Sequence, residues 1–128
     1  MSWEDGIAFD LGEDVQMVRD TARDFAMQEV LPIAAEIDRQ HRFPAELIPK
    51  MGQLGFMGAV IPAAYGGSEL PMPAYAFIIE ELAAACASTS IIVSAHNSLC
   101  ASPIVEFGTE DQKRQYLPQL AAGAHLGC

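Results

Sequence analysis

Positive charge is scarce in this sequence. Its 128 residues include 7 Lys and Arg against 17 Asp and Glu, a formal net charge of −10. An acidic surface repels nucleic-acid phosphates and anionic lipid headgroups. The composition therefore argues against a nucleic-acid-binding protein and against electrostatic docking on a membrane. Most acidic residues lie at or before Lys50, so we expect a solvated outer surface there and more deeply buried helices after it.

Cysteine and histidine are also few and scattered. The cysteines are Cys86, Cys100 and Cys128, and the histidines are His41, His96 and His125. No CxxC pair occurs, and an odd number of cysteines favours reduced thiols in a cytosolic or similar compartment. The histidines are too far apart in the sequence to suggest a ligand cluster, so we predict no metal site.

Long apolar runs are missing as well. The most apolar region, residues 74–107, is interrupted by Glu80, Glu81 and several polar residues, so we expect no membrane span. The first ten residues, MSWEDGIAFD, lack the basic residues and apolar run of a secretory signal and are too acidic for a transit peptide. We expect a cytoplasmic bacterial protein or, if it is eukaryotic, a mitochondrial matrix protein, and prefer the cytoplasm because no transit peptide is seen.

Helical periodicity is present throughout, whereas no strand pattern is convincing. We predict an all-α fold, an orthogonal or up-down bundle of about five to seven helices with short loops. Pro32 should kink the first helix or restart it, and Pro103 should break a later one. The expected helices cover about 11–41, 44–55, 73–87, 88–102, 103–108 and 110–123.

Several local signals refine these boundaries. Asp10 with Glu13, and Thr109 with Gln112, have capping-box spacing, and the ASTS segment at 87–90 offers N-cap candidates. Residues 56–67 lack a helical period and suggest a short extended segment and then a tight loop, in which the glycines of the GG pair are able to take positive φ. The helix at 73–87 should bury three side chains, those of Phe77, Ile78 and Leu82.

The segment STSIIVSAHNSLC, residues 88–100, mixes apolar residues with hydroxyls, an amide and a histidine. Ser94, His96 and Ser98 are the residue types of a nucleophile and a base, but positions i and i+2 of a helix do not face one another and no acid lies nearby to orient the histidine. We therefore predict no catalytic residue here and expect the small polar side chains to bond to their own backbone or to neighbouring helices. A self-contained hydrolase remains an alternative.

One face of this helix carries an apolar stripe within an arc of roughly 100°: Ile91, Ile92, Ala95 and Leu99. The opposite face carries Val93, His96, Asn97 and Cys100. Amphipathic stripes usually face a core, and the wall of a binding pocket is the other interpretation. Glu80 and Glu81 point about 100° apart, so we expect one solvated and one partnered carboxylate, not an acid/base pair.

Four phrases together resemble the N-terminal domain of the acyl-CoA dehydrogenase family, in the family's order and spacing. They lie at residues 19–44, 51–67, 80–90 and 96–123: RDTARDFAMQEVLPIAAEIDRQHRFP, MGQLGFMGAVIPAAYGG, EELAAACASTS and HNSLCASPIVEFGTEDQKRQYLPQLAAG. The resemblance covers about residues 11–128 and is nearest to short-chain, butyryl-type or short branched-chain members. It implies that residues 1–128 form the helical N-terminal domain, with the family's middle β-domain and C-terminal helical domain absent.

The resemblance also implies a function. Members use FAD to form α,β-unsaturated acyl-CoA from acyl-CoA, pass electrons to electron-transferring flavoprotein, and assemble as homo-oligomers, here a homotetramer. The family's catalytic glutamate lies beyond this chain, so no catalytic residue is expected here, and residues that bind FAD are not assigned. The family's acyl-pocket positions, aligned on NSL, fall on the stripe residues Ile91, Ile92, Ala95 and Leu99.

Three expectations follow for the chain by itself. It should be inactive, should retain no stoichiometric FAD, and should self-associate or be modestly stable because apolar surface is uncovered. The alternative is a stand-alone helical module that binds an acyl chain or a partner without catalysis.

Overall fold

The computed structural model describes residues 12–128, and every regular element in them is helical. The α-helices are α1 (Glu13–Phe25), α2 (Leu31–Arg39), α3 (Leu47–Gln53), α4 (Met72–Ala85), α5 (Ala87–Ser94), α6 (Ser102–Phe107) and α7 (Glu110–Ala121). Two π-helical segments, Ala26–Val30 and Ala95–Ala101, and one 3₁₀ turn, Ala63–Tyr65, complete the elements. Residues 12–128 contain no strand, and the predicted all-α fold is confirmed.

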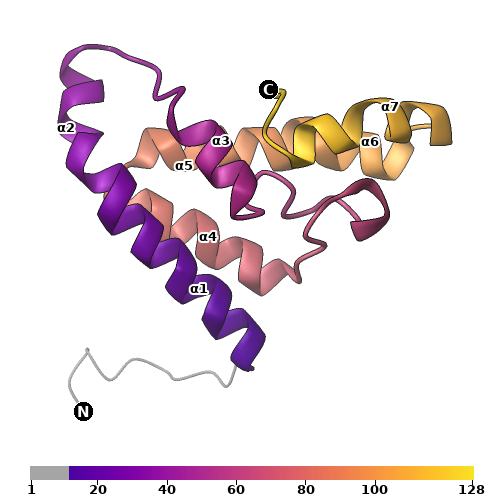
Figure 1. Ribbon diagram of the computed structural model, residues 1–128, viewed down its shortest axis with the longest axis horizontal. Helices are drawn as coiled ribbons and strands as arrows, with labels where there is room; N and C mark the ends of the chain where they lie inside the picture. The colour runs from indigo at the N-terminus through magenta and orange to yellow at the C-terminus, as the bar shows by residue number, and fades with distance from the viewer. Residues whose placement is uncertain (1–11) are drawn as a thin grey trace.

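Two long helical rods organise the domain. The first runs through α1 and α2, and the second through α5 and α6 (Figure 1). Helix α4 packs against α1 on one side and α5 on the other, while α7 folds back along α6. The main core fills the space around α4 and includes an edge-to-face contact between Phe25 and Phe56, with ring centroids 6.0 Å apart. A smaller core lies between α7 and the second rod.

Both rods contain a π segment just before a proline. Pro32 lies two residues after the first π segment, and Pro103 lies two residues after the second. Proline supplies no backbone N–H and crowds the preceding turn, and a widened i→i+5 turn can accommodate it without ending the helix. The predicted break at Pro103 is therefore wrong, because α5 continues through the π segment into α6. The first rod likewise continues past Pro32.

The helix boundaries follow the predictions in part. Thr109 and Gln112 form the predicted capping box, with the Thr109 hydroxyl accepting from the Gln112 backbone N–H at 3.2 Å. The N-cap of α5 is Cys86, so the prediction that the ASTS segment caps this helix is wrong. Asp10 lies outside the described residues, and α1 follows Gly12, whose φ is 78°.

The loop after α3 differs most from expectation. Residues 54–61 are a series of turns and bends, not an extended segment. Gly66 has the predicted positive φ of 84°, but Gly67 does not. Gly67 is required for another reason: an added Cβ would lie 1.9 Å from the Ile61 carbonyl oxygen. Ile78 and Leu82 are buried as predicted, whereas Phe77 is only half-buried beneath the guanidinium of Arg19.

Candidate functional site

The two faces of the second rod differ sharply in burial. Within the apolar stripe Ile91 is 66% exposed and Leu99 is 69% exposed. On the opposite face Val93, His96 and Asn97 are fully buried. The interpretation of the stripe as core is therefore wrong for Ile91 and Leu99, whereas Ile92 is partly buried against the main core. The largely polar face is the one that packs inward, and the stripe is left as a candidate pocket wall.

Asn97 explains part of why the polar face is buried, because its amide forms hydrogen bonds with backbone groups of the loop after α3. Its Nδ2 donates to the carbonyl of Phe56 at 3.0 Å and to that of Val93 at 3.1 Å, and its Oδ1 accepts from the N–H of Val60 at 3.3 Å. Buried backbone groups in an irregular loop need such partners. The amide thus anchors the turns at 56–60 to the second rod.

His96 has a similar role toward the end of the chain. Its Nδ1 accepts from the backbone N–H of Gly127 at 3.0 Å, and its Nε2 lies 3.1 Å from the carbonyl oxygen of Leu120. A backbone N–H can only donate, so Nδ1 carries no proton and Nε2–H donates to Leu120. Burial lowers the pKa of His96, although the nearby carbonyls oppose that shift. The ring is therefore the neutral Nε2–H tautomer.

This geometry leaves no nucleophile and base in contact. Both nitrogens of His96 bond to backbone, and the Ser98 hydroxyl donates to the carbonyl of Ser94 at 2.6 Å. The predicted bonding of this hydroxyl to backbone is confirmed. A hydrolase built on Ser94 or Ser98 with His96 has no support from these contacts.

Three of the four stripe residues share one apolar cavity. Ile91, Ile92 and Ala95 line a cavity of about 210 Å³ together with Phe43 and residues 126–128. Leu99 does not line it. This leucine lies inside the π segment, whose wider turns advance fewer degrees per residue than the α-helix assumed in placing the stripe. Ala95 lies in the same segment, so the angle between these two residues differs from the one expected for an α-helix.

Sequence reasoning missed the rest of the cavity lining. Phe43 precedes α3, and Leu126, Gly127 and Cys128 follow α7. No spacing rule connects these segments with residues 91–95, because they meet only through the packing of the rods. The one available signal was that Phe43 and Leu126 are large apolar residues in segments without helical periodicity.

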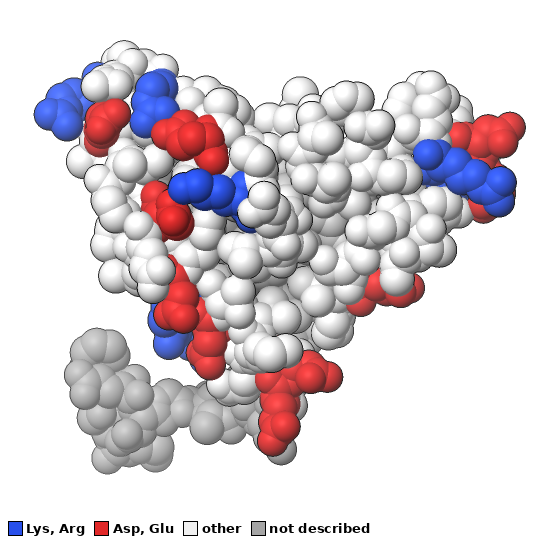
Figure 2. All heavy atoms as spheres, viewed as in Figure 1, with Lys and Arg blue, Asp and Glu red and all other residues white. Residues whose placement is uncertain are grey.

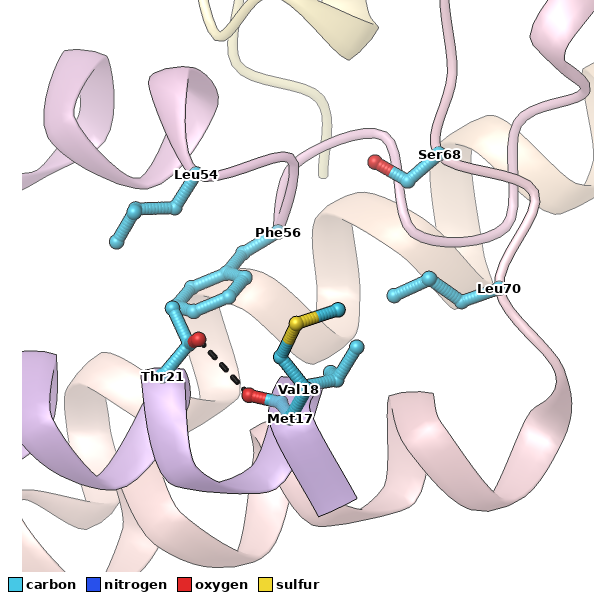
Figure 3. Close-up of a pocket in the computed structure, with 7 residues that line it drawn as sticks. All are labelled: Met17, Val18, Thr21, Leu54, Phe56, Ser68 and Leu70. Atoms are coloured by element: carbon cyan, nitrogen blue, oxygen red, sulfur yellow. Dashed lines mark hydrogen bonds between the residues drawn. The ribbon is translucent and has the colours of Figure 1, made fainter. Parts of the chain in front are cut away.

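A second apolar cavity lies elsewhere on the surface. It has a volume of about 160 Å³ and is bounded by α1, the end of α3 and the loop that leads to α4 (Figure 3). Met17 and Leu54 at its rim are 62% and 42% exposed. A third, between α6 and α7, is lined in part by Phe107, which is 79% exposed. Apolar surface is thus uncovered at several places.

Charge is concentrated away from the centre of the face in Figure 2. Charged side chains lie along the α1–α2 edge, at the start of α7 and in a further acidic patch on the lower edge, around a largely uncharged centre. Glu81 of α4 forms an ion pair with Arg19 at 3.2 Å and with Arg23 at 2.8 Å, which joins α4 to α1. Burial raises the pKa of Glu81, but these bonds outweigh it and hold the pKa below its ordinary value. Glu80 is exposed, so one carboxylate is solvated and one partnered, as predicted.

The described part of the chain offers neither a metal site nor a membrane-spanning helix. In residues 12–128, no three His, Cys, Asp or Glu side chains lie close enough together to hold a metal ion. No helix in the same range combines the length and apolar character needed to cross a bilayer. Cys86, Cys100 and Cys128 are all free thiols.

Comparison with protein families identifies one match across most of the chain. Residues 12–124 match the family described as "Acyl-CoA dehydrogenase, N-terminal domain". The chain is 49% identical over 119 residues to the short-chain specific acyl-CoA dehydrogenase of Clostridium acetobutylicum and 45% identical to the mitochondrial short-chain specific acyl-CoA dehydrogenase of Bos taurus. These matches cover 93% of this chain but only 31% and 29% of those proteins.

Solved structures give the same result. Butyryl-CoA dehydrogenase from Megasphaera elsdenii superposes with a TM-score of 0.86 at 36% identity, and acyl-CoA dehydrogenase complexed with FAD from Bacillus anthracis with 0.85 at 38%. A chain in a structure of the electron transferring flavoprotein of Acidaminococcus fermentans has a TM-score of 0.88 at 43% identity. The superpositions cover 94%, 91% and 94% of this chain and 32%, 20% and 32% of those chains, respectively.

Proposed function

The chain belongs to the acyl-CoA dehydrogenase family and matches its N-terminal domain. We propose that it is the N-terminal domain of a flavin-dependent acyl-CoA dehydrogenase. In the proposed reaction a base removes the α-proton of acyl-CoA and FAD accepts the β-hydrogen as hydride, which leaves an α,β-double bond. The chain spans about 30% of the length of these relatives. The base and most flavin contacts are therefore assigned to other parts of the whole protein.

The contribution of this chain is a wall of the acyl pocket. The observation that carries this proposal is the apolar cavity, in which Ile91, Ile92 and Ala95 meet and no charged side chain takes part. Each methylene of an acyl chain transferred from water to such a wall contributes about 0.8 kcal/mol. Leu99, exposed on the same rod, extends the wall beyond the cavity. The same surface excludes water from the reacting carbons when the pocket is closed.

The described residues suit the acyl end of the substrate better than a nucleotide. FAD and CoA both carry phosphate groups, which require cationic or backbone N–H partners. The sequence has no Lys or Arg between Lys50 and Lys113, and the cavity is lined by apolar and small residues and a cysteine. We therefore expect that FAD is a cofactor of the whole protein and is not retained by this chain alone.

No residue of this chain is proposed as catalytic. Glu81 is held by two arginines, and Glu80 is exposed on the surface of α4. The hydroxyls of Ser94 and Ser98 have no adjacent base. The four stripe residues are thus the only proposed site residues, and their proposed role is to form an apolar wall that limits the space for the acyl chain.

The partners proposed for the whole protein follow from its relatives. Electron-transferring flavoprotein is the proposed acceptor of electrons, in keeping with the match to a chain in a structure of that protein from A. fermentans. We also propose a homo-oligomer, a homotetramer, and a cytoplasmic location, or the mitochondrial matrix in a eukaryote, since named relatives are bacterial and mitochondrial.

A chimaeric enzyme tests the proposal. Residues 12–124 would replace the matching segment of the C. acetobutylicum dehydrogenase, and dehydrogenation of butyryl-CoA and longer acyl-CoA would be measured. We expect activity, and we expect Ala95→Phe to lower kcat/KM for butyryl-CoA by about tenfold or more, because the ring fills a cavity that accommodates only small groups. Ala84→Phe, the same change at an exposed position of α4, is the control. Equal effects of the two changes would contradict the proposed wall.

A stand-alone acyl-binding module is the second candidate, and the cavity within this one chain favours it. Calorimetry of the 128-residue chain with acyl-CoA of increasing length separates the two. Micromolar binding without FAD or turnover would support the module, whereas flat titrations at all lengths would count against it.

A further inference from the structure

The segment after α7 forms one side of the acyl cavity and is held by very few bonds. The N–H groups of Ala124 and His125 both donate to the carbonyl of Gln119 at 3.1 Å, which fixes the chain up to residue 125. Among residues 12–128, the one hydrogen bond made by residues 126–128 runs from the Gly127 N–H to His96 Nδ1. The cavity side formed by Leu126, Gly127 and Cys128 is therefore held by one hydrogen bond, to a ring nitrogen, besides its packing.

The histidine that supplies this nitrogen is itself immobilised. Its ring is fully buried, and its Nε2–H donates to the carbonyl of Leu120 in α7. Rotation of the ring would break both bonds at once, leaving buried polar groups without partners. The bond to Leu120 thus fixes the direction in which the Nδ1 lone pair points, and that direction is toward Gly127.

The packing of Gly127 shows that residues 126–128 lie in close contact with the second rod and with α7. An added Cβ would lie 2.2 Å from Cys100 Sγ and 3.5 Å from Leu120 Cδ2. The backbone at 127 therefore approaches the second rod and α7 as closely as a glycine allows. A small displacement of this segment would open or close the cavity beside Ala95.

We propose that His96 is a positioning residue for the acyl cavity, and that its neutral ring holds residues 126–128 in place as the cavity side facing Ile92 and Ala95. The inference depends on the proposed function only for the identity of the occupant. The claim about the position of the segment stands on the contacts of this chain. His96 does not touch the acyl group in this arrangement and acts through Gly127.

Two conservative substitutions separate positioning from simple core filling. In His96→Asn the side-chain oxygen can occupy the place of Nδ1 and still accept from Gly127, but the donor to Leu120 is lost. In His96→Gln the longer amide can reach Leu120, but the acceptor for Gly127 is lost. If His96 only fills space in the core, the two substitutions should disturb residues 126–128 to a similar extent. If His96 positions this segment, Asn should preserve its position and Gln should not.

The test is solution NMR of the full 128-residue chain. Amide hydrogen exchange of Gly127 reports its bond, and NOEs from the Leu126 methyl groups to Ile92 and Ala95 report the cavity side. In the wild type we expect the Gly127 amide to exchange about tenfold more slowly than a free peptide, as a bond of about 1.4 kcal/mol requires. We expect His96→Asn to keep more of the protection and of the NOEs than His96→Gln, because Asn retains the acceptor for Gly127 and loses only the orienting bond to Leu120, whereas His96→Gln should lose both signals. Methyl signals of Val30 and Ile78 in the main core control for folding.

Each outcome decides the inference. An unprotected Gly127 amide in the folded wild type would overturn it, and this measurement requires no variant. Equal behaviour of the two variants, both folded, would also overturn it. Titration of the same samples with butyryl-CoA addresses the proposed function separately: absence of any acyl-CoA effect would count against an acyl site in this chain, while the exchange and NOE data would still decide the role of His96.

Discussion

The second rod of this domain has two faces that reverse the usual distribution of polarity. One face presents Ile91 and Leu99 to solvent, and the other buries His96 and Asn97 completely. The buried polar groups bond to backbone of the loop at 56–60 and of the segments at 120–127. The exposed apolar groups have no such partners. On this rod the buried polar side chains therefore join the rod to distant backbone segments, whereas Ile91 and Leu99 form an uncovered apolar surface.

The largest expected effect comes from removing the amide of the buried face. Asn97→Ala would leave the Phe56 carbonyl and the Val60 N–H without their partner in a dry environment, so we expect a loss of about 2–4 kcal/mol in the free energy of unfolding. Urea denaturation followed by circular dichroism measures it. Ser98→Ala, at the exposed neighbouring residue, is the matched control and should cost less than about 0.5 kcal/mol. Similar losses of stability in Asn97→Ala and Ser98→Ala would contradict the conclusion that the buried polar face stabilises the fold.

The second prediction uses pH to charge the buried face. Burial lowers the pKa of His96, so the folded state binds its proton less readily than the unfolded state, whose histidine titrates at about 6.5. The contribution of neutral His96 to the free energy of unfolding is therefore fully present above about pH 6.5 and is lost as pH falls toward the folded-state pKa. We expect the free energy of unfolding to drop by on the order of 1 kcal/mol between pH 7 and pH 5. His96→Asn should flatten that slope, and an unchanged slope would contradict the assignment.

Substitution of Glu81 tests whether a partly buried charge outside the second rod contributes as much to the free energy of unfolding as the buried polar groups of that rod. Glu81→Gln removes one ion-pair partner of Arg19 and Arg23, and we expect a loss of about 1–2 kcal/mol at pH 7. Because the folded pKa of Glu81 is lowered, this contribution is present above about pH 4.5 and disappears as pH falls below it. Denaturation of wild type and variant at pH 7 and pH 3.5 measures the difference. Glu80→Gln should change stability little, because that carboxylate is exposed.

The smallest effect on stability is expected at the apolar face. Leu99→Gln should change the free energy of unfolding by less than about 0.5 kcal/mol, because the leucine is already mostly exposed. The same change should reduce self-association, since it removes part of an uncovered apolar surface. Light scattering over a range of concentrations measures this. A strictly monomeric wild type would argue against the expectation of self-association.

The sequence predicted the helical fold well because its signals are local. The Thr109 capping box and the positive φ of Gly66 each depend on a few neighbouring residues, and both are present. The burial of Asn97 could not be predicted in the same way, because its partners Phe56 and Val60 lie about 40 residues earlier in an irregular loop. The usual preference of apolar residues for the core then favoured the wrong face.

The candidate site was predicted to a similar extent. Helical spacing placed Ile91, Ile92 and Ala95 together, and they do share a cavity. Leu99 does not line that cavity, and it lies in a π segment that the spacing, which assumed an uninterrupted α-helix, did not anticipate. Phe43 and the residues after α7 could not be found at all, since tertiary packing alone brings them to the cavity.

The π segment before Pro103 also has a consequence for the proposed acyl-pocket wall. Ala95 and Leu99 both lie in this segment, and its wider turns set a different angle between them from that in an α-helix. Pro103 itself lines a different cavity. In the proposed wall, the relative direction of Ala95 and Leu99 therefore depends on the backbone geometry before Pro103 as well as on the two side chains themselves.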